Sequence, residues 1–148
     1  VYEEVLDAAV DPEEVLPALG GWESFVGEVV EHASEHDLEA QEIVDVTVYQ
    51  AQGRRVAAVH AEVKTGDEHV CGGPDIAVEG VALVELGTNR VLVPLTTTFF
   101  ARIDGVVDVD ADGTPELLVH TFPDTDQLLG ADGEAACEAG GDFCDCMC

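Results

Sequence analysis

An acidic segment between two apolar stretches carries the side chains best suited to chemistry in this 148-residue chain. Residues 108–118 read DVDADGTPELL, in which aspartates alternate with smaller residues until a glycine allows a sharp bend. Carboxylates in this pattern can turn inward around one cation, and calcium prefers six to eight oxygen ligands. The pattern therefore predicts a calcium site whose ligands are Asp108, Asp110, Asp112, the backbone carbonyl of Thr114, and Glu116.

The charge and the donor type of this segment both favour a hard divalent cation. Without a cation the clustered acids repel one another, and a divalent ion converts that repulsion into attraction. Oxygen donors alone suit calcium better than zinc or copper. The alternative is an Asp-rich hairpin turn, in which the same side chains accept hydrogen bonds from nearby backbone amides.

The stretch FFARIDGVVDVDADGTPELLVHTF, residues 99–122, resembles the calcium-loop segment of FG-GAP or VCBS-type repeats. In those repeats a strand enters the motif D-x-D-x-D-G-x-x-[DE], and an apolar strand leaves it. The resemblance implies calcium ligands at the five positions named above. It does not imply the β-propeller that such repeats often build, because a propeller needs several blades and only one such loop is visible. The loop also differs from an EF-hand, since Val119 stands where the twelfth-position glutamate would be.

Cysteines form the second group of reactive side chains: Cys71, Cys137, Cys144, Cys146 and Cys148. Their density near the C-terminus is typical of an oxidising compartment and favours disulfides, with Cys71 as a distant partner of the tail. Because five is an odd number, one thiol is free, pairs between molecules or binds a metal. The alternatives are a C-x-C-x-C clamp for a soft ion such as Cu(I) or Zn(II), and a reactive thiol.

Histidines and serines give weaker signals for catalysis. His32 and His36 have the spacing of two zinc ligands on a helix, but the glutamate of the motif H-E-x-x-H is missing, which favours a half-buried boundary pair. His60 and His120 read as ordinary strand residues. The serines lack a nucleophile-elbow context, and there is no phosphate-binding glycine loop. We therefore do not expect an enzyme. A calcium-supported hydrolase would need two carboxylates in a cleft.

The acidity of the chain limits its partners. There are 32 acidic residues against 5 basic ones, for a net charge of −27. Nucleic-acid binding is not expected, because phosphate contacts require Lys and Arg. A basic protein remains a conceivable partner, and a high-salt source would explain the acidity as well as calcium dependence does. No apolar run approaches the roughly 20 residues of a membrane span. The density of cysteines favours an extracellular, periplasmic or cell-surface location.

The elements that must position these groups read as helices followed by strands. Residues 1–40 predict helices, with Asp11 as an N-cap, Pro12 at the first helical position, and an apolar stripe from Trp22 to Ala33. The apolar period then changes to two. This period predicts strands over residues 44–49, 57–64, 76–86, 91–95, 97–107 and 116–122. Pro94 places its strand at an edge.

This order predicts an α+β fold, in which N-terminal helices precede a mostly antiparallel sheet of six to seven strands. Residues 1–123 would form a single domain, and residues 124–148 an irregular Cys-rich tail packed on it or tethered to it. We expect a secreted or cell-surface structural or interaction protein, stabilised by calcium and disulfides. A thiol-based metal-binding or redox module and a calcium-supported hydrolase remain alternatives. The odd cysteine or an unpaired edge strand could support a homo-oligomer or polymer.

Overall fold

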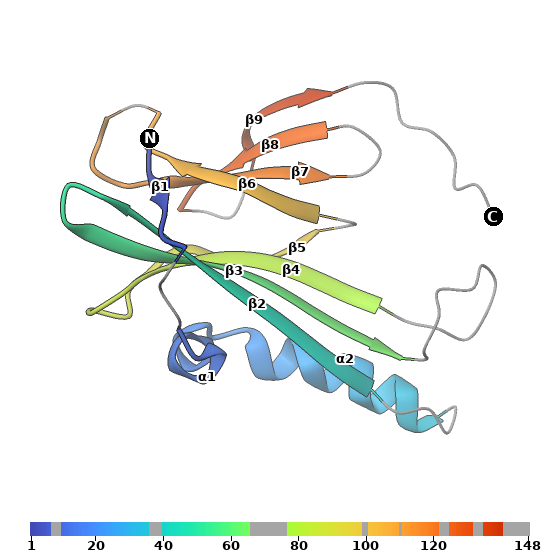
Figure 1. Ribbon diagram of the computed structural model, residues 1–148. Coiled ribbons are helices and arrows are strands. Elements are labelled where there is room, and N and C mark those ends of the chain that lie inside the picture. The colour runs from blue at the N-terminus through green and yellow to red at the C-terminus, as the bar shows by residue number, and fades with distance from the viewer. Residues whose placement is uncertain are drawn as a thin grey trace.

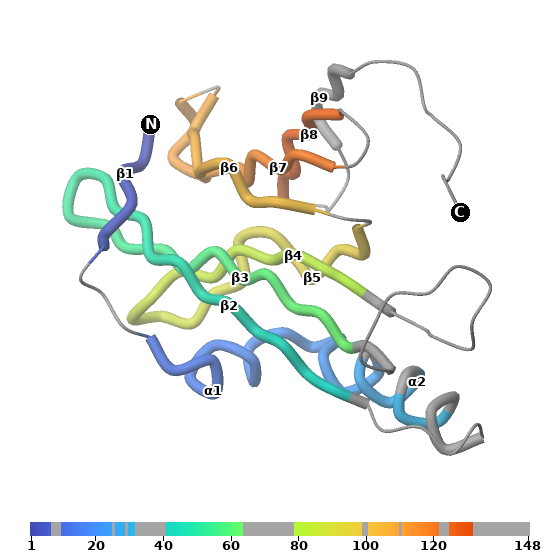
Figure 2. The backbone as a smooth tube through the Cα atoms, turned by 45° about the vertical axis from the view of Figure 1, so that its right-hand side comes forward, coloured from blue at the N-terminus to red at the C-terminus, as the bar shows by residue number. Residues whose placement is uncertain are grey.

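A computed structural model describes residues 1–6, 10–35, 40–65, 77–98, 101–109, 111–121, 125–131 and 135–140. The elements, in chain order, are β1 (Glu3–Glu4), α1 (Pro12–Val15), a 3-10 helix η1 (Leu16–Ala18), α2 (Trp22–Glu35), β2 (Ala40–Ala51), β3 (Arg54–Thr65), β4 (Ala77–Glu85), β5 (Val91–Thr98), β6 (Ala101–Val107), β7 (Glu116–Thr121), β8 (Thr125–Leu129) and β9 (Ala135–Gly140). They form three layers: the helices lie on one face of the sheet β1–β5, and the sheet β6–β9 lies on the other (Figures 1 and 2).

The first helix begins after Asp11 as the sequence predicts, but the prediction of helix for the residues before it is wrong, because Glu3 and Glu4 form the strand β1. Asp11 caps α1 by accepting a hydrogen bond from the amide of Glu13 at 3.0 Å, and Pro12 opens the helix. Val15 and Leu19 are buried against the central sheet, and Trp22 at the start of α2 packs beside them. The helices therefore cover the sheet face that presents Ala57, Val59, Ala82 and Val84.

The central sheet, which we call sheet A, has the strand order β1-β2-β3-β4-β5 and is antiparallel throughout. Strands β2 and β3 join through Gln52 and Gly53, whose φ angles of 52° and 78° suit the tight turns that match strand twist. Strand β3 is buried on both faces, with Val56 and Ala58 on one side and Ala57 and Val59 on the other. This double burial explains why β3 lacks polar residues over that stretch.

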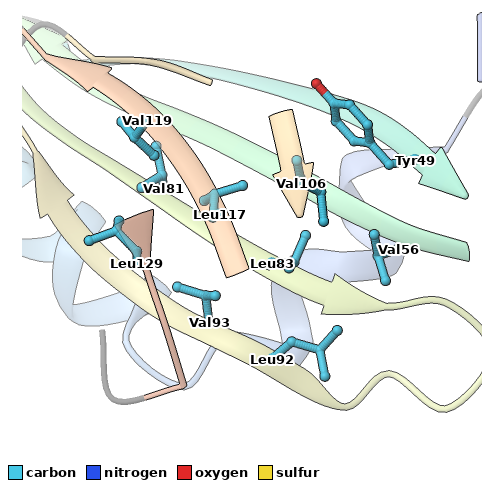
Figure 3. Close-up of a cluster of buried hydrophobic side chains, with 11 residues drawn as sticks. Tyr49, Val56, Val81, Leu83, Leu92, Val93, Val106, Leu117, Val119 and Leu129 are labelled. Atoms are coloured by element: carbon cyan, nitrogen blue, oxygen red, sulfur yellow. The ribbon is translucent and has the colours of Figure 1, made fainter. Parts of the chain in front are cut away.

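The outer sheet, which we call sheet B, has the strand order β6-β7-β8-β9. Its inward side chains pack against sheet A and form the main core (Figure 3). This core contains Tyr49, Val56, Ala58, Val81, Leu83, Leu92, Val93, Val106, Leu117, Val119 and Leu129. Each fully buried Val or Leu contributes roughly 1.5–3 kcal/mol relative to an exposed position.

The N-terminal strand connects the two sheets. Glu3 and Glu4 pair with Gln50 and Tyr49 of β2, while the amide of Tyr2 donates to the carbonyl of Val106 in β6 at 3.0 Å. Residues next to one another in the chain therefore bond to different sheets. This arrangement closes one edge of the interface between sheet A and sheet B.

The antiparallel α+β class is confirmed, but the strand count is wrong. The described residues contain nine strands in two sheets rather than six to seven in one. Residues 97–107, predicted as one strand, are divided between β5, which ends at Thr98, and β6, which begins at Ala101. The irregular tail predicted from residue 124 is also wrong in part, because β8 and β9 lie within it. Residues 141–148 lie outside the described part.

Two further expectations concern edges and membranes. Pro94 lies in β5, which is an edge strand of sheet A as predicted, and it falls at the irregularity of the β4–β5 ladder between the pairs Leu83↔Val93 and Val81↔Thr96. Among the described helices, none combines the length and the apolarity that crossing a bilayer requires.

Candidate metal centre

The acidic loop is held at both ends by the β6–β7 hairpin. Val107 pairs with Glu116 across the two strands, and Val106 and Leu117 beside them are fully buried in the core. Burial of these two side chains fixes the strand ends, because a slip of one residue would expose both of them. Residues 108–115 must therefore make the connection over a fixed distance.

Three predicted ligands converge in this loop. One carboxylate oxygen from each of Asp108, Asp112 and Glu116 lies within 4.8 Å of the others. Asp108 and Glu116 are half-buried, and Asp112 is exposed. Asp108 directly follows β6 and Glu116 opens β7, so the two ends of the loop contribute one carboxylate each.

Backbone amides of the loop hold these carboxylates in place. Asp108 accepts from the amides of Asp112 at 3.2 Å and Gly113 at 2.9 Å, and Asp112 accepts from the amide of Thr114 at 2.8 Å. Glu116 accepts from the amide of Val109 at 3.2 Å. These bonds are those expected of an Asp-rich turn. A carboxylate has about four acceptor positions, so a hydrogen bond from an amide and a contact with a cation are compatible on the same group.

Left-handed backbone conformations allow the loop to close on itself. Ala111 has a φ of 57° and Gly113 a φ of 86°. Glycine adopts such angles without the steric cost that a Cβ atom brings. The predicted role of Gly113 as the bending residue therefore agrees with its conformation.

The other two predicted ligands are Asp110 and Thr114. Asp110 lies outside the described residues. Thr114 is half-buried and takes part in the loop through its amide, which donates to Asp112. The structure thus brings together three of the five predicted ligands as side chains.

Arg54 is a functional candidate that the sequence did not single out. It opens β3, its Nη1 donates to the carbonyl of Gly113, and its Nε forms an ion pair with Glu85 at the end of β4. Partial burial disfavours the guanidinium charge, but the hydrogen bond to Glu85 raises the pKa of Arg54 above its ordinary value. The bonds from Arg54 and Thr88 lower the pKa of Glu85. One side chain thereby ties the acidic loop to sheet A.

A cavity of about 630 Å³ opens beside this contact. Its wall includes Arg54, Asp108 and Gly113 from the site, together with Tyr2 and Gln50 from the joined edge of the two sheets. The signal that would have found Arg54 is its rarity, since the chain has only five Lys and Arg residues, and two of them follow the β2–β3 turn.

The other predicted metal and disulfide candidates lie mostly outside the described residues. This is the case for Cys71, Cys144, Cys146, Cys148 and His36. Cys137 pairs through its backbone with Leu128 in the β8–β9 ladder, and His32 lies in α2, but their side chains are not described.

No family model, no curated protein and no solved structure matches this chain.

Proposed function

We propose that this chain is a calcium-stabilised structural or interaction domain that works outside the cytoplasm, with the β6–β7 loop as its ion site. The observation that carries the proposal is the convergence of Asp108, Asp112 and Glu116 within 4.8 Å. Three oxygen donors from one short loop suit calcium, which accepts carboxylates, carbonyls and water in a flexible geometry. Asp110 and the carbonyl of Thr114 would complete the ligand set, as the resemblance to FG-GAP or VCBS-type loops implies.

Electrostatics supplies the stabilising effect. Two unit charges 4.8 Å apart repel by about 1 kcal/mol in water-like surroundings, so three such charges weaken the loop when no cation is present. A bound dication removes this repulsion and adds attraction. At a calcium concentration about 100 times Kd, binding stabilises the folded state by about 2.7 kcal/mol.

The loop lies where an ion would affect the whole fold. Its ends belong to β6 and β7 of sheet B, and its Gly113 carbonyl accepts from Arg54 of sheet A. An ion that orders the loop therefore also orders the contact between the two sheets. This position favours a structural role for calcium over a catalytic one.

Location and partners follow from the sequence. The five cysteines favour disulfides and hence a secreted or cell-surface protein, where calcium is abundant. The net charge of −27 favours a basic protein as the partner of the exposed surface, and disfavours nucleic acid.

Thermal unfolding with calcium, with a chelator and with NaCl at matched ionic strength tests the proposal. For a chain of this size, about 2.7 kcal/mol corresponds to a rise in Tm of roughly 5–10 °C. Equal stabilisation by calcium and by NaCl would reduce the effect to general screening and refute a specific site.

A matched pair of variants separates the site from the overall charge. Glu116→Gln removes one proposed ligand, and Glu42→Gln removes the same charge from an exposed position in β2. We expect calcium to stabilise Glu42→Gln fully and Glu116→Gln much less. Calorimetric titration of each folded variant with calcium gives the affinity itself, so a general loss of stability would not imitate the result.

A further inference from the structure

A second group of ligand-type side chains lies on the face of sheet B that points away from the core. His120 of β7 stands directly opposite Asp126 of β8 in the strand register. Their neighbours Val119 and Leu117 point inward to the core, so His120 points outward. Asp104 lies next to them on β6, at the irregularity between Ile103 and Gly105.

The three side chains meet closely. One ligand atom from each of Asp104, His120 and Asp126 lies within 4.8 Å of the other two. The Nδ1 atom of His120 is 2.8 Å from Oδ1 of Asp126. The side chains of Asp104 and His120 are 29% and 25% exposed and that of Asp126 is 55% exposed, so the group lies at the surface with His120 partly shielded from water.

The β-bulge in β6 explains how Asp104 joins this group. Asp104 is the additional residue between the pairs Ile103↔Val119 and Gly105↔Leu118. A bulge of this kind redirects a side chain, and bulges are frequent beside binding sites. Three adjacent strands thus each contribute one donor to a single point on the sheet.

The donor set differs in chemistry from that of the β6–β7 loop. One imidazole nitrogen with two carboxylates suits Zn²⁺ and similar transition-metal ions, whereas calcium takes oxygen ligands. Three protein ligands also leave a fourth position for water. The two sites are distinct, because His120 lies four residues along β7 from Glu116, or roughly 13 Å.

We propose that Asp104, His120 and Asp126 bind one Zn²⁺-class ion on the outer face of sheet B. The ion joins β6, β7 and β8 across their side chains. Arg102, whose Nε donates to Oδ1 of Asp104 at 2.8 Å, holds that carboxylate in position.

Protection of individual histidines from chemical modification tests the site directly. The full chain, with any free thiols alkylated and with calcium saturating the loop, is treated with diethyl pyrocarbonate with and without Zn²⁺. Peptide mass analysis then reports each histidine separately. We expect Zn²⁺ to protect His120 and to leave His60 equally reactive. Equal modification of His120 with and without Zn²⁺ would overturn the proposal.

Titration of variants with Zn²⁺ supplies the second readout. Asp126→Asn should weaken Zn²⁺ binding at least about tenfold. The control Asp45→Asn changes the same group at an exposed position in β2 and should bind Zn²⁺ like the parent chain. If Glu116→Gln abolished Zn²⁺ binding while Asp126→Asn retained it, the metal would lie in the β6–β7 loop and the proposal would be wrong.

Discussion

Raising the pH should weaken a contact by which His60 helps to join the two sheets. His60 lies on β3, two residues after Ala58, and so shares the face of sheet A that packs against sheet B. Its Nε2 is 2.9 Å from Oε1 of Glu79 on β4, and the same oxygen accepts from the amide of Ala101, the first residue of β6. The side chains of His60 and Glu79 are only 22% and 12% exposed.

The direction of the pH effect follows from the charges around His60. The hydrogen bond to Glu79 raises the pKa of His60 above its ordinary value of 6.5, burial opposes this shift, and the charges of Glu79, Asp45 and Glu62 add to it. The folded state therefore holds this proton more tightly than the unfolded chain. The resulting stabilisation is fully present below pH 6.5 and is lost as the pH rises through the folded-state pKa of His60.

The size of the effect can be worked from the contact itself. Neutral imidazole can still donate to Glu79, whose carboxylate stays charged. Deprotonation of His60 therefore removes only the attraction between two opposite charges, about 1–1.5 kcal/mol at this contact. For a chain of this length, the corresponding fall in Tm is roughly 2–6 °C.

Urea unfolding at a series of pH values from 6 to 9, at constant ionic strength, measures this loss. The variant His60→Gln keeps a donor for Glu79 but cannot titrate, so its free energy of unfolding should fall less steeply with pH. Subtracting the two curves removes the contributions of all other groups. Parallel curves for the parent chain and His60→Gln would show that the contact does not hold the proton, and the reasoning would fail.

Two further perturbations test how the acidic loop is held. Arg54→Gln should destabilise the chain by about 1–3 kcal/mol, because it leaves Glu85 without its main partner. Once Arg54 has been replaced, the further substitution Glu85→Gln should cost less stability than it does in the parent chain. A double-mutant cycle in urea measures this coupling. Gly113→Ala should cost about 1–2 kcal/mol, because its φ is +86°, whereas Gly27→Ala in the open interior of α2 should stabilise by about 0.5–1 kcal/mol. Equal effects of the two glycine variants would rule out the backbone explanation.

Sequence signals between residues close in the chain predicted much of the fold. Asp11 followed by Pro12 predicted the start of α1, and the change of period near Val44 predicted the β2–β3 hairpin. Both signals act between residues close in the chain, where capping and side-chain alternation decide the conformation. The acidic loop was readable for the same reason, because Asp108, Asp112 and Glu116 fall within one turn between two strands.

The division into two sheets could not be read from the same signals. β-branched residues lie on both sides of positions 99–100, and such a composition does not say which sheet a strand joins. Strands β8 (TDQLL) and β9 (AACEAG) were missed because they contain few β-branched or aromatic residues, so their propensity is low and pairing of β8 with β7 and of β9 with β8 decides the outcome.

Contacts between strands that are distant in the chain also could not be predicted from the sequence. Arg54 and Gly113 are 59 residues apart, so their contact depends on how the two sheets pack. His120 read as an ordinary strand residue, because its juxtaposition with Asp104 requires both the strand register and the bulge in β6. The sequence thus predicted groups within one loop, but not groups assembled across strands.

The N-terminal edge, which contacts both sheets, sets an order in which contacts form as the chain is synthesised and folds. Tyr2 cannot complete its bond to Val106 until more than one hundred further residues have been synthesised, whereas Glu3 and Glu4 can pair with β2 as soon as residues 49–50 are available, so this edge joins sheet A before it joins sheet B. During that interval the edge of β1 that faces away from β2 is open to other chains. Glu3 and Glu4 occupy this strand, and paired negative charges on a waiting edge repel identical nascent neighbours. Glu3 and Glu4 therefore have two effects: they pair with β2 in the folded protein, and before folding is complete their charges oppose pairing with a second copy of the chain.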